Sequence, residues 1–117
     1  MTDKITTAEQ MADKIKKTHY AKESDFQRDL LRFLRLKGCF CIKLQAGPGV
    51  PTATPDILFC HYGFYGFIEV KLSKRSRLQP GQRESVAKLN EMSYAKIIYP
   101  ENFSELEEDL WDLRKEG

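Results

Sequence analysis

Two short apolar segments lie at the centre of the sequence, DILFC (56–60) and FIEVKL (67–72), and only the turn-forming residues HYGFYG (61–66) separate them. Apolar segments of this length are typical of buried strands, and so short a connection joins antiparallel neighbours. The sequence therefore predicts a β-hairpin in the middle of the fold. Both faces of such apolar strands must be shielded from water, so other segments of the chain must pack against them.

The clearest helix that the sequence predicts covers residues 23–37, ESDFQRDLLRFLRLK. At about 100° per residue its apolar side chains fall on one stripe, and Gly38 follows as a typical helix stop. The apolar stripe consists of Phe26, Leu30, Phe33 and Leu34. Glu23 and Gln27 lie close to the same stripe, so we expect them to be buried. A carboxylate there needs a partner or a metal, because an unpaired buried charge is costly.

The remaining segments complete an alternation of helices and strands. Residues 39–45 and 95–99 read as strands, and residues 46–55, with three prolines and two glycines, read as a loop. A helix is expected from Pro80 onward, and another over residues 102–117. The closing helix offers Phe103, Leu106, Leu110, Trp111 and Leu113 to the core. This order predicts an α/β domain with a central mixed β-sheet flanked by helices.

Chain length bounds the domain organisation. The 117 residues, 41% hydrophobic and 31% charged, suit one compact globular domain. Residues 1–22 have weak helical character and several lysines, which indicates a helical segment or an arm. We therefore expect an N-terminal segment over 1–22 and a single domain over 23–117 that ends in an acidic helix.

Several classes of protein are disfavoured by the sequence. No apolar run approaches the roughly 20 residues that span a bilayer, and the first ten residues contain no signal-peptide core, so we predict an intracellular protein. The cysteines at 39, 41 and 60 are odd in number and do not describe a disulfide framework. They also lack the paired short spacings of a zinc finger.

The net charge of +2 conceals an asymmetry. Residues 101–117 contain seven acids and two bases, so the first hundred residues carry 17 bases against 10 acids. Lys71, Lys74, Arg75 and Arg77 place four bases within seven residues. A basic body suits a nucleic-acid partner, and phosphate contacts by this loop are the favoured interpretation. A plain solvated surface is the alternative.

Three ionisable residues occupy the predicted hairpin. Side chains alternate along a strand, so Glu69 and Lys71 project from the same face. If the hairpin turns between Tyr62 and Gly63, Asp56 lies opposite Glu69, with Cβ atoms roughly 4.5–5.5 Å apart. Two carboxylates this close repel, which a proton or a cation would relieve. A hard cation with oxygen ligands and retained waters fits best, so we expect Mg²⁺ or Mn²⁺.

Further residues are candidates for the same site. Lys71 would position an attacking water and offset charge on a phosphate. Glu23 would add a metal ligand or orient a bound water, and Gln82 would hold Lys71 or the water. Each has a structural alternative, which is a solvated strand face for Glu69 and Lys71 and a helix-start position for Glu23 and Gln82.

These residues resemble the PD-(D/E)xK nuclease superfamily, written here as Pro55-Asp56 followed by Glu69-Val70-Lys71. Within it the chain is similar to the VRR-NUC family, through Glu23-x-x-x-Gln27, TPDIL, FIEVK and the LQPGQ stretch that ends in Gln82. The resemblance covers residues 23–99. One departure is the loop before Pro55, which is longer here than in the family.

The resemblance implies a restriction-endonuclease-like core that cleaves DNA phosphodiester bonds with Mg²⁺. It further implies homodimers that cut branched DNA such as Holliday junctions. Asp56 and Glu69 would bind metal with help from Glu23, and Lys71 and Gln82 would complete the site. An exonuclease or restriction-type enzyme of the same fold and an inactive DNA-binding module are the alternatives.

A dimer would need an interface, for which the sequence offers two candidates. One is the N-terminal segment (1–22), and the other is the closing helix around Trp111. We favour the N-terminal segment, because an acidic helix would set like charges against each other across a twofold axis.

Overall fold

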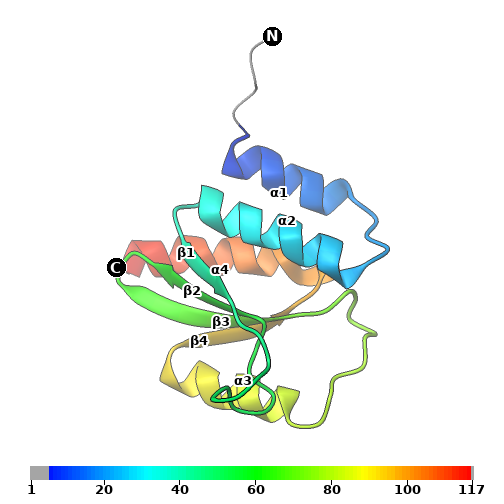
Figure 1. The fold of residues 1–117 in the computed structure, drawn as a ribbon. Coiled ribbons are helices and arrows are strands. Elements are labelled where there is room, and N and C mark those ends of the chain that lie inside the picture. Colours follow the sequence, from blue (N-terminus) through cyan, green and yellow to red (C-terminus); the bar gives the residue numbers. More distant parts are fainter. Residues whose placement is uncertain (1–5, 117) are drawn as a thin grey trace.

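The computed structural model describes residues 6–116 and sets a four-stranded sheet between helices (Figure 1). The elements are α1 (Ala8–Lys17), α2 (Glu23–Leu36), β1 (Phe40–Lys43), β2 (Ile57–His61), β3 (Phe64–Val70), α3 (Gln82–Met92), β4 (Tyr94–Ile98), a 3-10 turn (Pro100–Asn102) and α4 (Phe103–Glu116). The predicted α/β class is confirmed. Residues 1–5 of the expected N-terminal segment lie outside the described residues.

The sheet is mixed, with strand order β1-β2-β3-β4. β1 and β3 run antiparallel to β2, and β4 runs parallel to β3. In the central hairpin Ile57 pairs with Ile68 and Phe59 pairs with Gly66. One step further along the same register, Asp56 faces Glu69. The register expected from the sequence is therefore confirmed.

The hairpin turn is tighter than the sequence predicts. β2 runs to His61 and β3 already begins at Phe64, so the expected six-residue turn is wrong for residue 61 and for residues 64–66. Tyr62 and Gly63 form the turn with φ angles of 46° and 90°. Positive φ at both central residues is typical of the two-residue turns whose twist matches that of paired strands. The short turn adds three pairs to those of the expected strands, namely Phe59–Gly66, Cys60–Tyr65 and His61–Phe64.

Helices cover the two faces of the sheet unequally (Figure 1). α2 and α4 lie on one face with α1 outside them, and α3 packs on β3 and β4 from the other face. Between α2, α4 and the sheet lies the hydrophobic core. Its fully buried side chains include Phe26, Leu30, Phe33, Leu34, Ile57, Phe59, Ile68, Ile98, Phe103 and Leu106. The apolar stripe expected for residues 23–37 is thus confirmed.

The closing helix contributes fewer residues to this core than predicted. Phe103, Leu106 and Leu110 are buried at helical spacing. Trp111 is 59% exposed, so the expectation that it packs in the core is wrong. The residue after Leu110 is rotated by about 100° around the helix, which turns it away from the sheet. The side chain of Leu113 lies outside the described residues.

α1 packs against α2 and belongs to the same core. Ala8, Met11, Ala12 and Ile15 are buried along its inner side. The predicted division at residue 22 falls in the linker between the two helices, and it stays a prediction. Among residues 6–116 no helix has the length and apolar character needed to cross a membrane.

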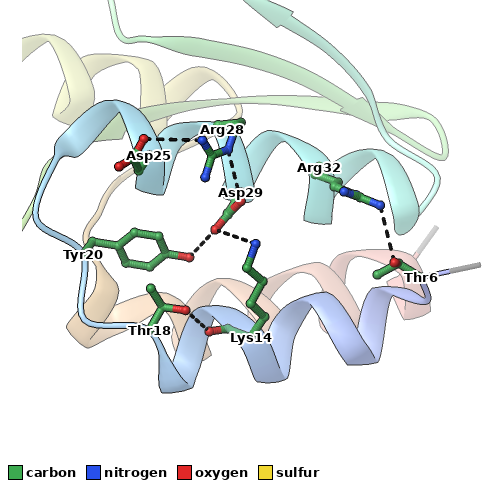
Figure 2. Close-up of polar contacts among 8 residues, drawn as sticks. All are labelled: Thr6, Lys14, Thr18, Tyr20, Asp25, Arg28, Asp29 and Arg32. Atoms are coloured by element: carbon green, nitrogen blue, oxygen red, sulfur yellow. Dashed lines mark hydrogen bonds and ion pairs between the residues drawn. The ribbon is translucent and has the colours of Figure 1, made fainter. Parts of the chain in front are cut away.

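A buried carboxylate ties α1 to α2 (Figure 2). Asp29 on α2 is 3% exposed, and its Oδ2 accepts a 2.7 Å hydrogen bond from the Tyr20 hydroxyl of the linker. The Lys14 ammonium of α1 lies 3.6 Å from the same oxygen, and Arg28 Nε lies 3.4 Å from Oδ1. Three donors from three segments therefore converge on one charge.

We expect Asp29→Asn to lower the free energy of unfolding by about 1–3 kcal/mol, because it weakens hydrogen bonds to a buried charged group. Asp25→Asn is the matched control. Asp25 contacts the same Arg28 at 3.4 Å near the surface, and such pairs contribute only about 0.2–1 kcal/mol. Denaturant titrations measure both variants, and equal stabilities for the two would contradict this role of Asp29.

Candidate active site

The start of β2 and the end of β3 bring two carboxylates together. Asp56 directly precedes β2, where its carbonyl accepts a 2.7 Å hydrogen bond from the Leu44 amide. Its side-chain Oδ2 accepts a 2.7 Å hydrogen bond from the Val70 amide. These bonds hold Asp56 from both neighbouring strands. Glu69 lies opposite Asp56 in the strand register, and the charge of Asp56 acts on the Glu69 carboxyl.

The surroundings of Glu69 are those of a buried functional carboxylate and not of a residue on a solvated strand face. It is only 2% exposed, and its Oε1 is buried without a hydrogen-bond partner among the described residues. Burial raises the pKa of Glu69 to about 8, the hydrogen bond and charge of Asp56 add to this effect, and Lys71 opposes it. A carboxylate in such surroundings favours the uptake of a proton or a cation.

Lys71 and Glu23 stand next to this pair. The Lys71 amide donates a 3.0 Å hydrogen bond to the Ile98 carbonyl, which continues the parallel pairing past the end of β3. Lys71 therefore shares a face with Glu69, as predicted. Partial desolvation raises the pKa of Glu23, and the charge of Asp56 raises it further. The charge of Lys71 and a hydrogen bond from the Leu72 amide act in the opposite direction. Glu23, at the start of α2, therefore lies close enough for the charges of Asp56 and Lys71 to act on it.

The burial expected for Glu23 is wrong, and the role expected for Gln82 stays a prediction. Glu23 is exposed rather than buried, because it is the first residue of α2 and no preceding turn covers it. Gln82 makes no hydrogen bond to Lys71 within residues 6–116. Its Oε1 instead accepts a 2.7 Å hydrogen bond from the Gln79 amide at the start of α3. Gln82 also lines a groove of about 440 Å³ against the loop over 46–55.

The carboxylate pair can be tested for fit to a metal. In the described part of the chain, no three His, Cys, Asp or Glu side chains converge into a complete metal site. Glu23 therefore does not join Asp56 and Glu69 in a cluster of three ligands among the described residues. Mg²⁺ usually takes only one or two carboxylates and keeps several waters. Asp56 and Glu69, with the unpartnered Oε1, fit that demand.

A basic pocket of about 730 Å³ adjoins the pair, and Lys71 lies on its wall. The pocket is bounded by the loop after β3, the start of α3 and the end of β4. Lys74 and Arg77 of the predicted basic loop line it, whereas Arg75 does not. Arg83 and Tyr99 also line it, and sequence reasoning missed both. Arg83 directly follows Gln82, and that position is the only signal that could have identified it.

A family model described as archaeal Holliday junction resolvase (hjc) matches residues 18–103. The chain belongs to the Hjc family. The matched region contains Glu23, Asp56, Glu69, Lys71 and Gln82. Membership in the Hjc family confirms the predicted PD-(D/E)xK-type nuclease fold, and the narrower VRR-NUC assignment stays a prediction.

Among solved structures, the chain is similar to Hjc from Archaeoglobus fulgidus, a Holliday junction resolvase from an archaeal hyperthermophile. The two are 28% identical with a TM-score of 0.48, and the alignment covers 63% of this chain and 63% of that chain. A comparison with curated protein sequences found no match.

We expect Glu69→Gln to stabilise the metal-free protein at alkaline pH. A folded-state pKa of about 8 lies above the ordinary value of 4.5, so the folded protein holds a proton that the unfolded chain has lost. The stability that depends on this proton is complete below pH 4.5 and disappears as the pH rises through about 8. Gln mimics the protonated form and removes this loss.

Thermal unfolding in EDTA between pH 6 and 9 measures the effect, with Glu91→Gln on exposed α3 surface as the control. The midpoint of the wild type should fall relative to that of Glu69→Gln as the pH rises, whereas Glu91→Gln should follow the wild type. Parallel curves for all three proteins would show that Glu69 titrates normally.

Proposed function

We propose that the protein is a Mg²⁺-dependent DNA endonuclease that hydrolyses phosphodiester bonds in branched DNA, as a Holliday junction resolvase. The observation that carries the proposal is the buried Glu69 with its unpartnered Oε1 beside Asp56, in a chain of the Hjc family. A buried acid beside a second carboxylate lowers stability, and binding of a cation would offset that loss.

The carboxylates of Asp56 and Glu69 would hold Mg²⁺ or Mn²⁺, with Glu23 assisting from the rim. The bound ion supplies an activated water and a Lewis acid for the phosphate. The charge of Lys71 lowers the pKa of both Glu69 and Glu23. Lys71 is therefore suited to orient the water and to offset negative charge that develops on the phosphate.

The remaining predicted residues have supporting roles. Gln82 positions the start of α3 through its bond to the Gln79 amide. Lys74, Arg75 and Arg77 are exposed, and we assign them to contacts with the DNA backbone. The narrower VRR-NUC kinship stays with this proposal and is supported by the motifs LQPGQ and TPDIL. The intracellular location also stays with it and is supported by membership in a family of DNA-processing enzymes.

We further propose a homodimer that forms through the open half of the sheet. α3 packs on β3 and β4, and beside it Phe40, Ile42 and Tyr65 are 68%, 43% and 45% exposed. Residues paired across neighbouring strands point to the same face of the sheet, so the strand partners of these three residues lie on that face too. The full set, here called the open face, is Phe40, Ile42, Leu58, Cys60, Tyr65 and Phe67.

A second copy is the occupant that suits the open face. Its six side chains are uncharged, so a twofold axis through it sets no like charges against each other. Glu69 follows Phe67 by two residues on the same face, so both carboxylate pairs would flank one axis. The N-terminal segment is less suited, because the apolar side chains of α1 are buried against α2. Two symmetric incisions in a junction require two such sites.

An exonuclease or a restriction-type enzyme of the same fold is the second candidate, and an inactive DNA-binding module is the third. The unpartnered buried acid disfavours the inactive module, which would gain stability by losing it. A cleavage panel of four-way junction, flap, fork, linear duplex and single-stranded DNA with Mg²⁺ separates the active candidates. Preferential paired nicks in the junction support the resolvase.

We expect Asp56→Asn and Glu69→Gln each to abolish junction cleavage while binding survives. Each change removes a ligand charge and leaves the shape of the side chain nearly intact. The rate should fall by more than the roughly 10–100-fold that loss of an outer-sphere partner costs at a metal site. Single-turnover cleavage and electrophoretic mobility shifts measure the two effects, with Glu91→Gln as control. Full activity in either variant would remove Asp56 and Glu69 from the metal site.

We expect light scattering to give twice the chain mass for the wild type and the chain mass for Phe40→Glu. The charge would be buried at a twofold interface but tolerated on an exposed strand in the monomer. Trp111→Glu is the matched control, because Trp111 is also an exposed aromatic residue and lies on the closing helix, outside the open face. A monomeric wild type, or a monomer produced by Trp111→Glu alone, would contradict this interface.

A further inference from the structure

We propose that the basic pocket beside Lys71 binds a second DNA phosphate next to the scissile one, and that Arg83 and Arg77 hold it. The choice of DNA as the source of the phosphate rests on the proposed function. Arg83 and the pocket itself have no part in the roles assigned so far.

The pocket has the shape and composition of an anion site. It encloses about 730 Å³ between the loop after β3, the first turn of α3 and the end of β4. Four bases line it, namely Lys71, Lys74, Arg77 and Arg83, and Glu84 is the one acid among its lining residues. Tyr99 adds a hydroxyl on the β4 side. A cleft lined by one sign of charge concentrates the field and attracts the opposite charge.

Within residues 6–116 none of Lys74, Arg77 and Arg83 forms an ion pair, whereas the charge of Lys71 acts on the neighbouring Glu69 and Glu23. The ion pairs within residues 6–116 involve Lys14, Lys16, Arg28 and Lys96, all of them outside the pocket. Glu101 also lies near, and its carboxylate accepts a 3.3 Å hydrogen bond from the Lys74 backbone amide. The pocket therefore keeps most of its positive charge for a ligand.

A phosphodiester is the anion that fits best. Arginine presents a planar fork of donors that matches phosphate oxygens, and two arginines face this pocket from different elements. Lys71 borders both the pocket and the carboxylate pair, so a strand whose scissile phosphate lies at Glu69 would place a neighbouring phosphate in the pocket. The pocket then fixes the path of the cut strand.

Local hydrogen bonds hold the conformation of the loop over residues 73–79, which forms one wall of the pocket. The Ser73 amide donates a 3.1 Å hydrogen bond to Ser76 Oγ, and the Ser76 amide donates a 3.0 Å bond to the Ser73 carbonyl. The Arg75 amide donates to Ser73 Oγ at 3.1 Å. Arg77 thus reaches the pocket from a closed turn, while Arg75 stays outside it.

The test measures junction binding against salt in the Asp56→Asn background, where cleavage does not interfere. Fluorescence anisotropy follows a labelled four-way junction with the Arg83→Ala, Arg77→Ala and Lys88→Ala variants. Lys88 is the matched control, because it is an exposed base of α3 outside the pocket. Arg83→Ala and Arg77→Ala should each weaken binding and reduce the log–log salt slope by about 0.9, the share of one phosphate on duplex DNA. Lys88→Ala should leave the slope unchanged.

Further outcomes separate this proposal from the proposed function. If the wild type cuts junctions but Arg83→Ala and Arg77→Ala keep its affinity and slope, the pocket proposal is wrong and the nuclease stands. If the wild type binds junctions without cutting them and both variants lose slope, the pocket stands and the nuclease falls. Micromolar binding of inorganic phosphate that Arg83→Ala removes, with DNA binding unaffected, would assign the pocket to a small anion and overturn the proposal.

Discussion

The structure depends on the antiparallel register between β2 and β3. Ile57 opposite Ile68 sets Asp56 opposite Glu69, and the helices around the sheet leave Glu69 only 2% exposed. Burial next to a second carboxyl raises the pKa of Glu69 to about 8 and leaves its Oε1 without a partner among the described residues. The same packing that stabilises the hairpin therefore makes the ionised form of Glu69 unfavourable, and a bound divalent cation would compensate its negative charge.

Other elements place further functional groups around Asp56 and Glu69. α2 begins at Glu23 beside the site, and the buried Asp29 fixes α1 and the linker against α2. The parallel pairing of β3 with β4 extends to Lys71 and opens the basic pocket at the same end of the sheet. Acidic groups for a metal and basic groups for phosphate thus lie side by side at one end of the strands.

Sequence alone predicts what depends on local pattern. Alternation and a short turn are enough to place Asp56 opposite Glu69, because an antiparallel register follows from the position of the turn. Helical periodicity identifies the buried stripe from Phe26 to Leu34 but not the exposure of Glu23, which depends on where α2 begins. The place of Arg83 in the pocket and the open face around Phe40 result from how α3 docks on the sheet. No spacing in the sequence encodes that docking.

The most direct test of the account is the titration of the Glu69 carboxyl carbon by NMR, with and without Mg²⁺. Without the ion, the resonance should titrate near pH 8, far above the ordinary value of 4.5 for a glutamate. With saturating Mg²⁺ the carboxyl should be ionised throughout the neutral range, because the cation replaces the proton. A normal titration in the metal-free protein, or one that Mg²⁺ leaves unchanged, would contradict the proposed metal site.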